Sequence, residues 1–259
     1  MKNPFNENEL PKAEMVELGL IDPDGNYAIS QEDVEAMLAG RRTGLVRLND
    51  LEASGFHIEH LDAKLSLSRE ADGKVAFKLH PIYKEAVIPD LLEKKEAEQL
   101  IRGQVATIAK SKPVSAKQEI VYEYDPETRE FIAYDPVKVI VPDKINGYQL
   151  TDAQKGDWKK GFPIMLPDST RVQHRATDPK GILADRAALV LSVLLDGGIS
   201  YLLIRGIRHL LNATEPQRDE NTPAFKKAYA EMENHFAKKF QVTPRSNEEN
   251  RGYTRTHSR

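Results

Sequence analysis

The sequence predicts an α+β protein made of tandem small modules, each a helix, a strand and a hairpin, followed by a C-terminal helical hairpin and an amphipathic helix. Three segments align on Gly40, Gly103 and Gly161, at spacings of 63 and 58 residues. A period of this size indicates a recurring supersecondary unit. Apolar and polar residues alternate after the first two glycines, which is typical of strands.

These patterns divide the chain into six parts. They are an N-terminal helix and turn (1–27), a first α+β module (28–86), a second (87–139), a third and partial one (140–181), an apolar helical hairpin (182–212), and an amphipathic helix with a basic tail (213–259). The three modules predict the fold class, and the last two parts contain the residues predicted to bind partners.

Each predicted helix begins at a capping pair and ends at its glycine. The pairs are Ser30 with Asp33, Asp90 with Glu93, and Thr151 with Gln154. In such a pair the first side chain accepts a hydrogen bond from the free N–H groups of the first turn. Glycine favours the left-handed conformation that ends many helices. Because Asp90 lies further from its glycine, we expect the middle helix to be about one turn longer.

A hairpin follows the first two glycines. In "KLSLSREADGKVAFKLHP" the strands alternate around Asp72-Gly73, and in "EIVYEYDPETREFIAYDP" they alternate around "DPET". Both turns have residues that favour a chain reversal. After the third glycine, "TRVQHRATDPKGI" begins in the same way and then loses the pattern.

The most apolar segment, residues 187–204, has 18 residues flanked by Arg186 and Arg205, which is close to the length of a membrane span. Asp196 at its centre costs roughly 2.5 to 3.5 kcal/mol in a bilayer. We therefore predict two short buried helices joined at "DGG", with a membrane-associated hairpin and a true span as alternatives. Asp196 either caps the second helix or pairs with Arg205 or Arg208.

The segment "NTPAFKKAYAEMENHFAKKF" predicts an amphipathic helix. Thr222 suits the N-cap, Pro223 suits the first helical position, and aromatic residues and one methionine recur every three or four residues. This stripe docks on the protein's own body, on a second copy through residues 222–240, or on a partner. The candidate partner-binding residues are Phe225, Tyr229, Met232, Phe236 and Phe240.

Charge is distributed unevenly along the chain. Residues 1–90 contain 10 Lys and Arg against 17 Asp and Glu, whereas residues 170–259 contain 15 against 10. The basic C-terminal third suits nucleic acid, although solvated faces of opposite charge are the more common cause of such an imbalance. The candidate nucleic-acid-binding residues are Arg245, Arg251, Tyr253, Arg255 and Arg259.

The sequence offers little catalytic chemistry. It has no cysteine, which excludes disulfides, thiolate metal sites and cysteine nucleophiles. Nucleotide-binding, serine-hydrolase and zinc-protease motifs are absent. The nearest metal-like group is His57, His60 and Asp62, and the nearest acid–base group is His174, Arg175 and Asp178. We expect no catalytic residues, no metal and no cofactor, hence no enzyme. The polar start of the chain favours a cytoplasmic protein without membrane association.

With "AMLAGRRTGLVRL", "LPDSTRVQHRATDPKG" and "LVLSVLLDGGISYLLIRGI", the chain resembles an uncharacterised repeat-bearing domain family of Bacteroidetes conjugative transposons and related mobile elements. The similarity covers about residues 13–235, and Trp158 stands where we expect Leu. Relatives of this kind are often encoded near mobilisation or topoisomerase genes. The resemblance implies a non-enzymatic accessory protein that binds nucleic acid or a DNA-processing partner. The alternative is a protein-interaction or membrane-proximal adaptor of the transfer machinery.

Overall fold

The protein is α+β, with short helices and antiparallel sheets. The computed structural model describes residues 3–53, 55–112, 115–195, 198–211, 213–219 and 221–241. The chain opens with the 3-10 helix η1 (Glu7–Glu9) and helix α1 (Lys12–Glu17). Helix α1 lies beside the sheet that follows it in the chain, because Met15 of α1 is fully buried in the hydrophobic core of that region.

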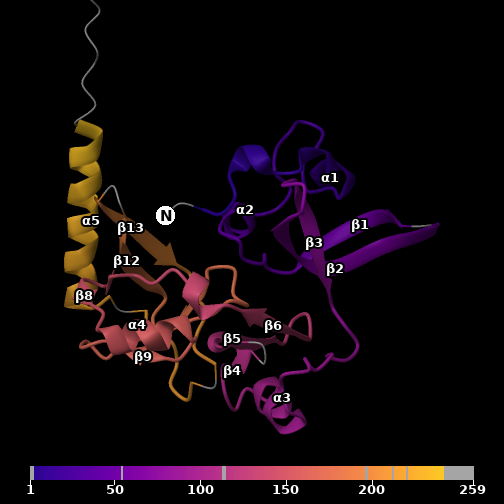
Figure 1. The fold of residues 1–259 in the computed structure, drawn as a ribbon. Helices are drawn as coiled ribbons and strands as arrows, with labels where there is room; N and C mark the ends of the chain where they lie inside the picture. The colour runs from indigo at the N-terminus through magenta and orange to yellow at the C-terminus, as the bar shows by residue number, and fades with distance from the viewer. Residues whose placement is uncertain are drawn as a thin grey trace, which may run out of the picture.

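Three units follow one another along the chain, each with an eight-residue helix and a three-stranded antiparallel sheet whose successive strands are neighbours (Figure 1). Unit 1 contains α2 (Gln31–Leu38), β1 (Val46–Ala53), β2 (Phe56–Arg69) and β3 (Val75–Pro81). Unit 2 contains α3 (Lys94–Ile101), β4 (Ile108–Lys112), β5 (Ser115–Asp125) and β6 (Glu130–Tyr134). Unit 3 contains α4 (Asp152–Lys159), β9 (Ile164–Met165), β10 (Arg171–His174) and β11 (Ile182–Ala184).

The three helices end alike. Gly40, Gly103 and Gly161 each follow the last helical residue by two positions, with φ of 73°, 65° and 70°. This left-handed conformation turns the chain away from the helix axis, and it is inexpensive for glycine. The two outer caps form as predicted, because Ser30 Oγ accepts from the Asp33 N–H and Thr151 Oγ1 accepts from the Gln154 N–H.

The prediction for the middle cap is wrong. Helix α3 begins after Glu93, whose N–H donates to Glu96 Oε2 at 2.9 Å. Asp90 lies in a turn that precedes Leu92, and Leu92 is buried in the core of unit 2. Burial of Leu92 therefore outweighs the capping preference of Asp90, and α3 is no longer than α2 or α4.

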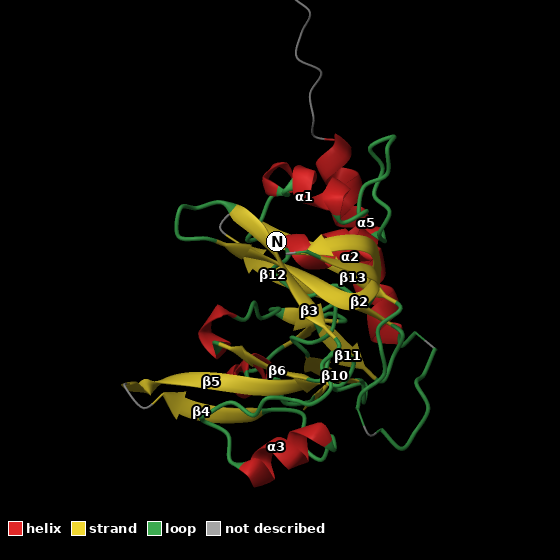
Figure 2. Cartoon of the chain, turned by 90° about the vertical axis from the view of Figure 1, so that its right-hand side faces the viewer, coloured by secondary structure: helices red, strands yellow, loops and turns green. Residues whose placement is uncertain are grey.

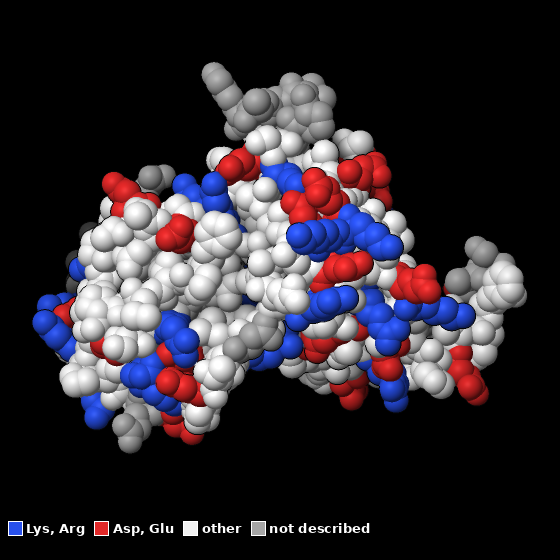
Figure 3. Space-filling view, turned by 90° about the horizontal axis from the view of Figure 1, so that it is seen from below, with Lys and Arg blue, Asp and Glu red and all other residues white. Residues whose placement is uncertain are grey.

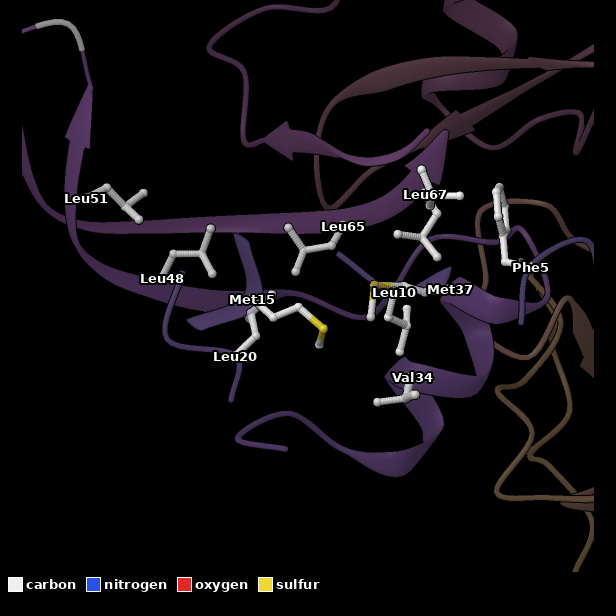
Figure 4. Close-up of a cluster of buried hydrophobic side chains, with 11 residues drawn as sticks. Phe5, Leu10, Met15, Leu20, Val34, Met37, Leu48, Leu51, Leu65 and Leu67 are labelled. Atoms are coloured by element: carbon white, nitrogen blue, oxygen red, sulfur yellow. The ribbon is translucent and has the colours of Figure 1, made fainter. Parts of the chain in front are cut away.

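The core of unit 1 is apolar and lies between its helix and one face of its sheet (Figure 4). Leu48 and Leu65 of β1 and β2 point toward Met15 and Met37, which come from α1 and α2. In unit 2, α3 covers one face of the β4–β5–β6 sheet (Figure 2). Each of these units therefore has a hydrophobic core of its own.

The apolar segment after unit 3 forms strands, so the predicted helical hairpin at 182–212 is wrong. Strands β12 (Ala188–Leu195) and β13 (Gly198–Arg205) pair antiparallel over eight residue pairs. They extend a four-stranded sheet in the order β13-β12-β7-β8, which includes β7 (Lys144–Ile145) and β8 (Tyr148–Gln149). Asp196 and its predicted capping or ion-pair role lie outside the described residues.

The physical reason for this error is burial on both faces. Leu189 and Leu191 of β12 pack into the core of unit 3, whereas Val190 packs against the C-terminal helix. A strand covered on both faces is apolar throughout and has no alternation. Periodicity alone does not distinguish such a strand from a short buried helix.

Helix α5 (Pro223–Gln241) lies along the β12–β13 hairpin (Figure 1). Thr222 Oγ1 accepts from the Phe225 N–H at 3.1 Å and so caps the helix. Phe225 and Met232 are buried against the hairpin. In the part of the chain that the structure describes, no helix has the length and apolar character that a bilayer crossing needs.

Candidate functional site

A cleft of about 1050 Å³ lies where the three units and the β12–β13 hairpin meet. One wall includes α2 and the residues that follow Gly40. Another is strand β13, together with Leu191 and Val193 of β12. The lining also includes residues 132–135 of unit 2, Ser66, Lys78 and His80 of unit 1, the loop 138–142, and residues 179–182 of unit 3. This volume is at the upper end of the range for small-molecule sites, so the cleft has room for a segment of a macromolecule.

The segment after Gly40 fixes how the units meet beside the cleft. Arg41 Nε donates to the carbonyl of Pro179 in unit 3 at 2.7 Å, and Arg42 donates to Glu130 in unit 2 at 2.7 Å. Because the left-handed glycine turns the chain at this point, two consecutive arginines of unit 1 reach different neighbours.

A buried ion-pair network joins the units at the same junction. Lys64 of β2 has no exposed surface, and its Nζ lies 2.7 Å from Asp125 and 2.8 Å from Glu127 in unit 2. It also donates to the carbonyl of Thr177 in unit 3 at 3.3 Å. A buried ammonium group requires such partners, because desolvation of an unpaired charge is expensive.

A second buried pair lies close to the first. Arg175 of unit 3 lies 3.4 Å from Glu123 of β5, whose carboxylate also accepts from the N–H groups of Ala176 and Thr177. Burial raises the pKa of Glu123, and Arg175 opposes the shift. Loop 175–181 of unit 3 is thus held between units 1 and 2 by charged and polar contacts.

An aromatic group contributes to the cleft lining. The rings of Tyr134 and Trp158 lie 5.5 Å and 5.9 Å from the ring of His174, measured between centroids. Burial, together with the charges of Arg41 and Arg175, lowers the pKa of His174 to about 4. His174 Nδ1 and Tyr134 Oη have no hydrogen-bond partner among the described residues. The imidazole is therefore neutral at pH 7.

A serine, a histidine and a carboxylate stand in order beside the same cleft. Ser66 Oγ lies 2.9 Å from His80 Nε2, and His80 Nδ1 lies 3.4 Å from Glu130. Burial and Arg42 lower the pKa of His80 to about 4, which makes it a weak base at neutral pH. The carboxylate of Glu130 also accepts a hydrogen bond from Arg42. The N–H of Leu65, the residue before Ser66, already donates to Thr43 Oγ1 and is not available to a reaction intermediate. The trio fits a structural polar cluster better than an activated nucleophile.

Strand β13 lies at the edge of its sheet and borders the cleft. On β12 the carbonyls of Val190 and Ser192 accept from residues around β7, so the backbone groups of both residues point toward β7. Their register partners on β13 are Leu203 and Tyr201. In an antiparallel ladder these partners direct their N–H and C=O groups away from β12, to the free edge.

The cleft is more basic than the protein as a whole. Its lining includes six Lys and Arg against three Asp and Glu, whereas the whole chain has a net charge of −3. Elsewhere, on the surface seen from below, acidic and basic side chains intermingle (Figure 3). The six basic residues of the lining are Arg41, Arg42, Lys78, Lys138, Lys180 and Arg205.

The predicted partner-binding stripe lies mostly against the protein itself. Phe225 and Met232 are buried, Tyr229 is half-buried, and Phe236 is 37% exposed. Phe240 belongs to α5, but its side chain lies outside the described residues. The predicted nucleic-acid-binding residues, Arg245, Arg251, Tyr253, Arg255 and Arg259, also lie outside the described residues.

The two weak chemical groups of the sequence do not assemble. His57 contacts Glu52 at 3.0 Å on an exposed hairpin, and in the described ranges no cluster of three metal-ligating side chains occurs. Arg175 pairs with Glu123, whereas Asp178 pairs with Arg208 at 2.6 Å. The ring of His174 packs against Tyr134 and Trp158 instead, so the side chains of the predicted acid–base group lie in three different environments.

The cleft could not be predicted from the sequence. Its lining comes from segments far apart in the chain, and the contacts between Lys64 and unit 2 span 61 residues or more. One local signal was present: "AGRRTG" places two arginines directly after a helix-ending glycine, where they point to a neighbouring element.

The comparisons with known proteins identify one similarity. Residues 5–89 match a family described as a protein of unknown function (DUF4099). The match covers about a third of the chain, namely the N-terminal segment and unit 1, and it ends between β3 and α3. Neither the curated proteins nor the solved structures include a match to this chain.

Proposed function

We propose that this protein is a non-enzymatic accessory protein that binds a protein partner in the cleft between its units. The observation that carries this proposal is the composite lining: all three units and the open edge of β13 contribute to one basic cleft. The proposal also treats the three units as copies of one module that together form a scaffold. Because the chain resembles proteins of mobile elements, we infer that the partner belongs to the machinery that transfers or maintains such an element.

Affinity capture from cells that carry the parent element tests this proposal. The full chain is compared with a cleft variant, Lys138→Glu with Arg205→Glu, and with a matched control on α3, Lys94→Glu with Lys95→Glu. All four basic side chains are exposed, but only Lys138 and Arg205 line the cleft. We expect the control to capture the same polypeptides as the wild type. The cleft variant should bind them about tenfold more weakly, because two favourable charges become unfavourable.

Equal capture by the cleft variant contradicts the proposal. Hydrolysis of a nitrophenyl ester that is lost in Ser66→Ala also contradicts it, because the Ser66–His80–Glu130 trio would then be catalytic.

A second candidate function, nucleic-acid binding, rests on the balance of 15 Lys and Arg against 10 Asp and Glu in residues 170–259. It is tested in the same capture experiment. Nuclease treatment should remove the captured material if nucleic acid is the ligand, and so should replacement of Arg245, Arg251, Arg255 and Arg259 by serine.

A further inference from the structure

We propose that the free edge of β13 binds an extended, acidic segment of a partner protein by strand addition. This inference rests on the proposed function and specifies what the cleft recognises. Six consecutive residues of β13, from Ser200 to Arg205, line the cleft. Side chains on one face of a strand would contribute only every second residue. Leu191 and Val193 of β12 line the cleft as well, so it covers the face of the hairpin that holds Ser200, Leu202 and Ile204. Because Tyr201, Leu203 and Arg205 also line it, the cleft continues around the backbone edge of β13.

The edge offers a regular row of backbone groups. Tyr201 and Leu203 direct their N–H and C=O groups outward, and by the alternation of the ladder Ile199 and Arg205 do the same. In the described part of the chain no residue forms a hydrogen bond with these outward groups. An added peptide strand supplies both the donors and the acceptors that such a row requires. A nucleic-acid backbone supplies acceptors but few donors.

The two faces of β13 differ, which gives an added strand a defined register. Tyr201 and Leu203 pack against α5 on one face. On the opposite face Leu202 is 41% exposed, and Ile140 of the neighbouring loop is 47% exposed and lines the same cleft. Apolar side chains at alternate positions of the added strand would cover these two residues.

Charge favours an acidic occupant. Lys78, Lys138 and Arg205 line the cleft and are exposed, and within the described ranges none of them forms an ion pair. Of the three acidic residues in the lining, Glu32 pairs with Lys180 at 2.9 Å, and the other two, Glu35 and Asp135, are outnumbered by these three basic side chains. Carboxylates on the added strand would therefore meet uncompensated positive charge.

The shape of the cleft argues against a second copy of this chain. Helix α2 also lines the cleft that β13 borders, through Gln31, Glu32 and Glu35. A second β13 edge would be bordered by its own α2 in the same way. Two recessed edges do not approach closely enough to pair, whereas a single extended chain enters the cleft.

The probe for this inference is a fluorescein-labelled, eight-residue peptide of alternating Glu and Val, which matches the eight residues of β13. Its counterpart with Lys in place of Glu is the charge control. We expect saturable binding of the acidic peptide to the full chain, and binding of the basic peptide at least about tenfold weaker. Amide hydrogen exchange of Ile199, Tyr201 and Leu203 should slow when the acidic peptide is bound.

Matched variants separate strand addition from general binding in the cleft. Ile199→Pro removes one outward N–H, which no β12 residue uses, and Ile199→Val keeps that N–H. We expect Ile199→Pro to weaken binding of the acidic peptide about tenfold and Ile199→Val to leave it unchanged. Arg205→Glu should also weaken it, whereas Lys95→Glu on α3 should not.

Four results overturn the inference, and none of them affects the proposed function as long as the cleft variant still loses its captured partners. The first is that neither peptide binds. The second is equal binding to Ile199→Pro and Ile199→Val, together with unchanged amide exchange along β13. The third is equal binding of the acidic and basic peptides. The fourth is a concentration-dependent dimer that Ile199→Pro abolishes, because β13 would then pair with a second copy.

Discussion

Lys64 and Leu65 are adjacent in β2, and neither has any exposed surface, yet they face opposite surroundings. Leu65 packs into the apolar core of unit 1 (Figure 4), whereas Lys64 faces Asp125 and Glu127 of unit 2. The core within the unit is thus held by hydrophobic burial, and the junction between units by ion pairs and hydrogen bonds. Ion pairs and hydrogen bonds depend on distance and direction more strongly than hydrophobic contacts do. This chain therefore has directional interactions where its units must dock in one arrangement.

The largest effect is expected at the junction. Lys64→Met leaves Asp125 buried without its nearest cation, and we expect a loss of about 4 kcal/mol in the free energy of unfolding. A second change, Asp125→Asn, should recover at least half of that loss, since it removes the unpaired charge. Chemical denaturation of the two variants measures both numbers. Lys74→Met is the control, because Lys74 is 65% exposed and lies 3.8 Å from Glu14.

If Lys64→Met proves as harmless as Lys74→Met, the junction does not depend on its ion pairs, and the contrast between the two sides of β2 is lost.

In the core of unit 1 we expect Leu65→Ala to cost about 3 kcal/mol, through lost burial and the cavity that remains. The cost should not change with salt or pH, because no charged group is involved. Leu79, the register partner of Leu65 on β3, is 36% exposed, so Leu79→Ala should cost clearly less. The same denaturation measurements at low and high salt provide the comparison. A salt-dependent loss in Leu65→Ala would mean that the core and the junction are not separate.

The acid stability of the junction gives the third test. The pKa of His174 is about 4 in the folded protein and ordinarily 6.5, so the unfolded chain binds more protons between these values. Stability should therefore fall as the pH decreases from about 6.5 to about 4, by up to about 3 kcal/mol from this residue. His174→Gln should make that part of the pH profile less steep, and the slope that remains comes from His80, whose pKa is also about 4.

The control for this titration is His57→Gln, because the side chain of His57 is 53% exposed. An unchanged profile in His174→Gln would mean that this imidazole takes up its proton without cost at the junction.

Local signals in the sequence predicted much of the fold. The Ser30 and Thr151 caps, the glycines that end the helices, and the turn at Asp72-Gly73 are interactions among near neighbours. The β12–β13 hairpin was mistaken for helices because α5 and unit 3 cover its two faces, and neither contact is encoded within the segment. The cleft was missed for the same reason, since Arg41, His80 and β13 meet only after the units dock.

The position of Lys64 has a consequence for synthesis of the chain on the ribosome. Its partners lie 61 and 113 residues further along the sequence, at Asp125 and Thr177. When unit 1 has been made and the later units have not, that face of β2 exposes a hydrated ammonium group to water instead of an apolar surface. At this position an unfinished chain therefore exposes a charged surface, which favours contact with water over contact with other chains, until the remaining units are made. An apolar side chain at this position would favour aggregation with other nascent chains during the same interval.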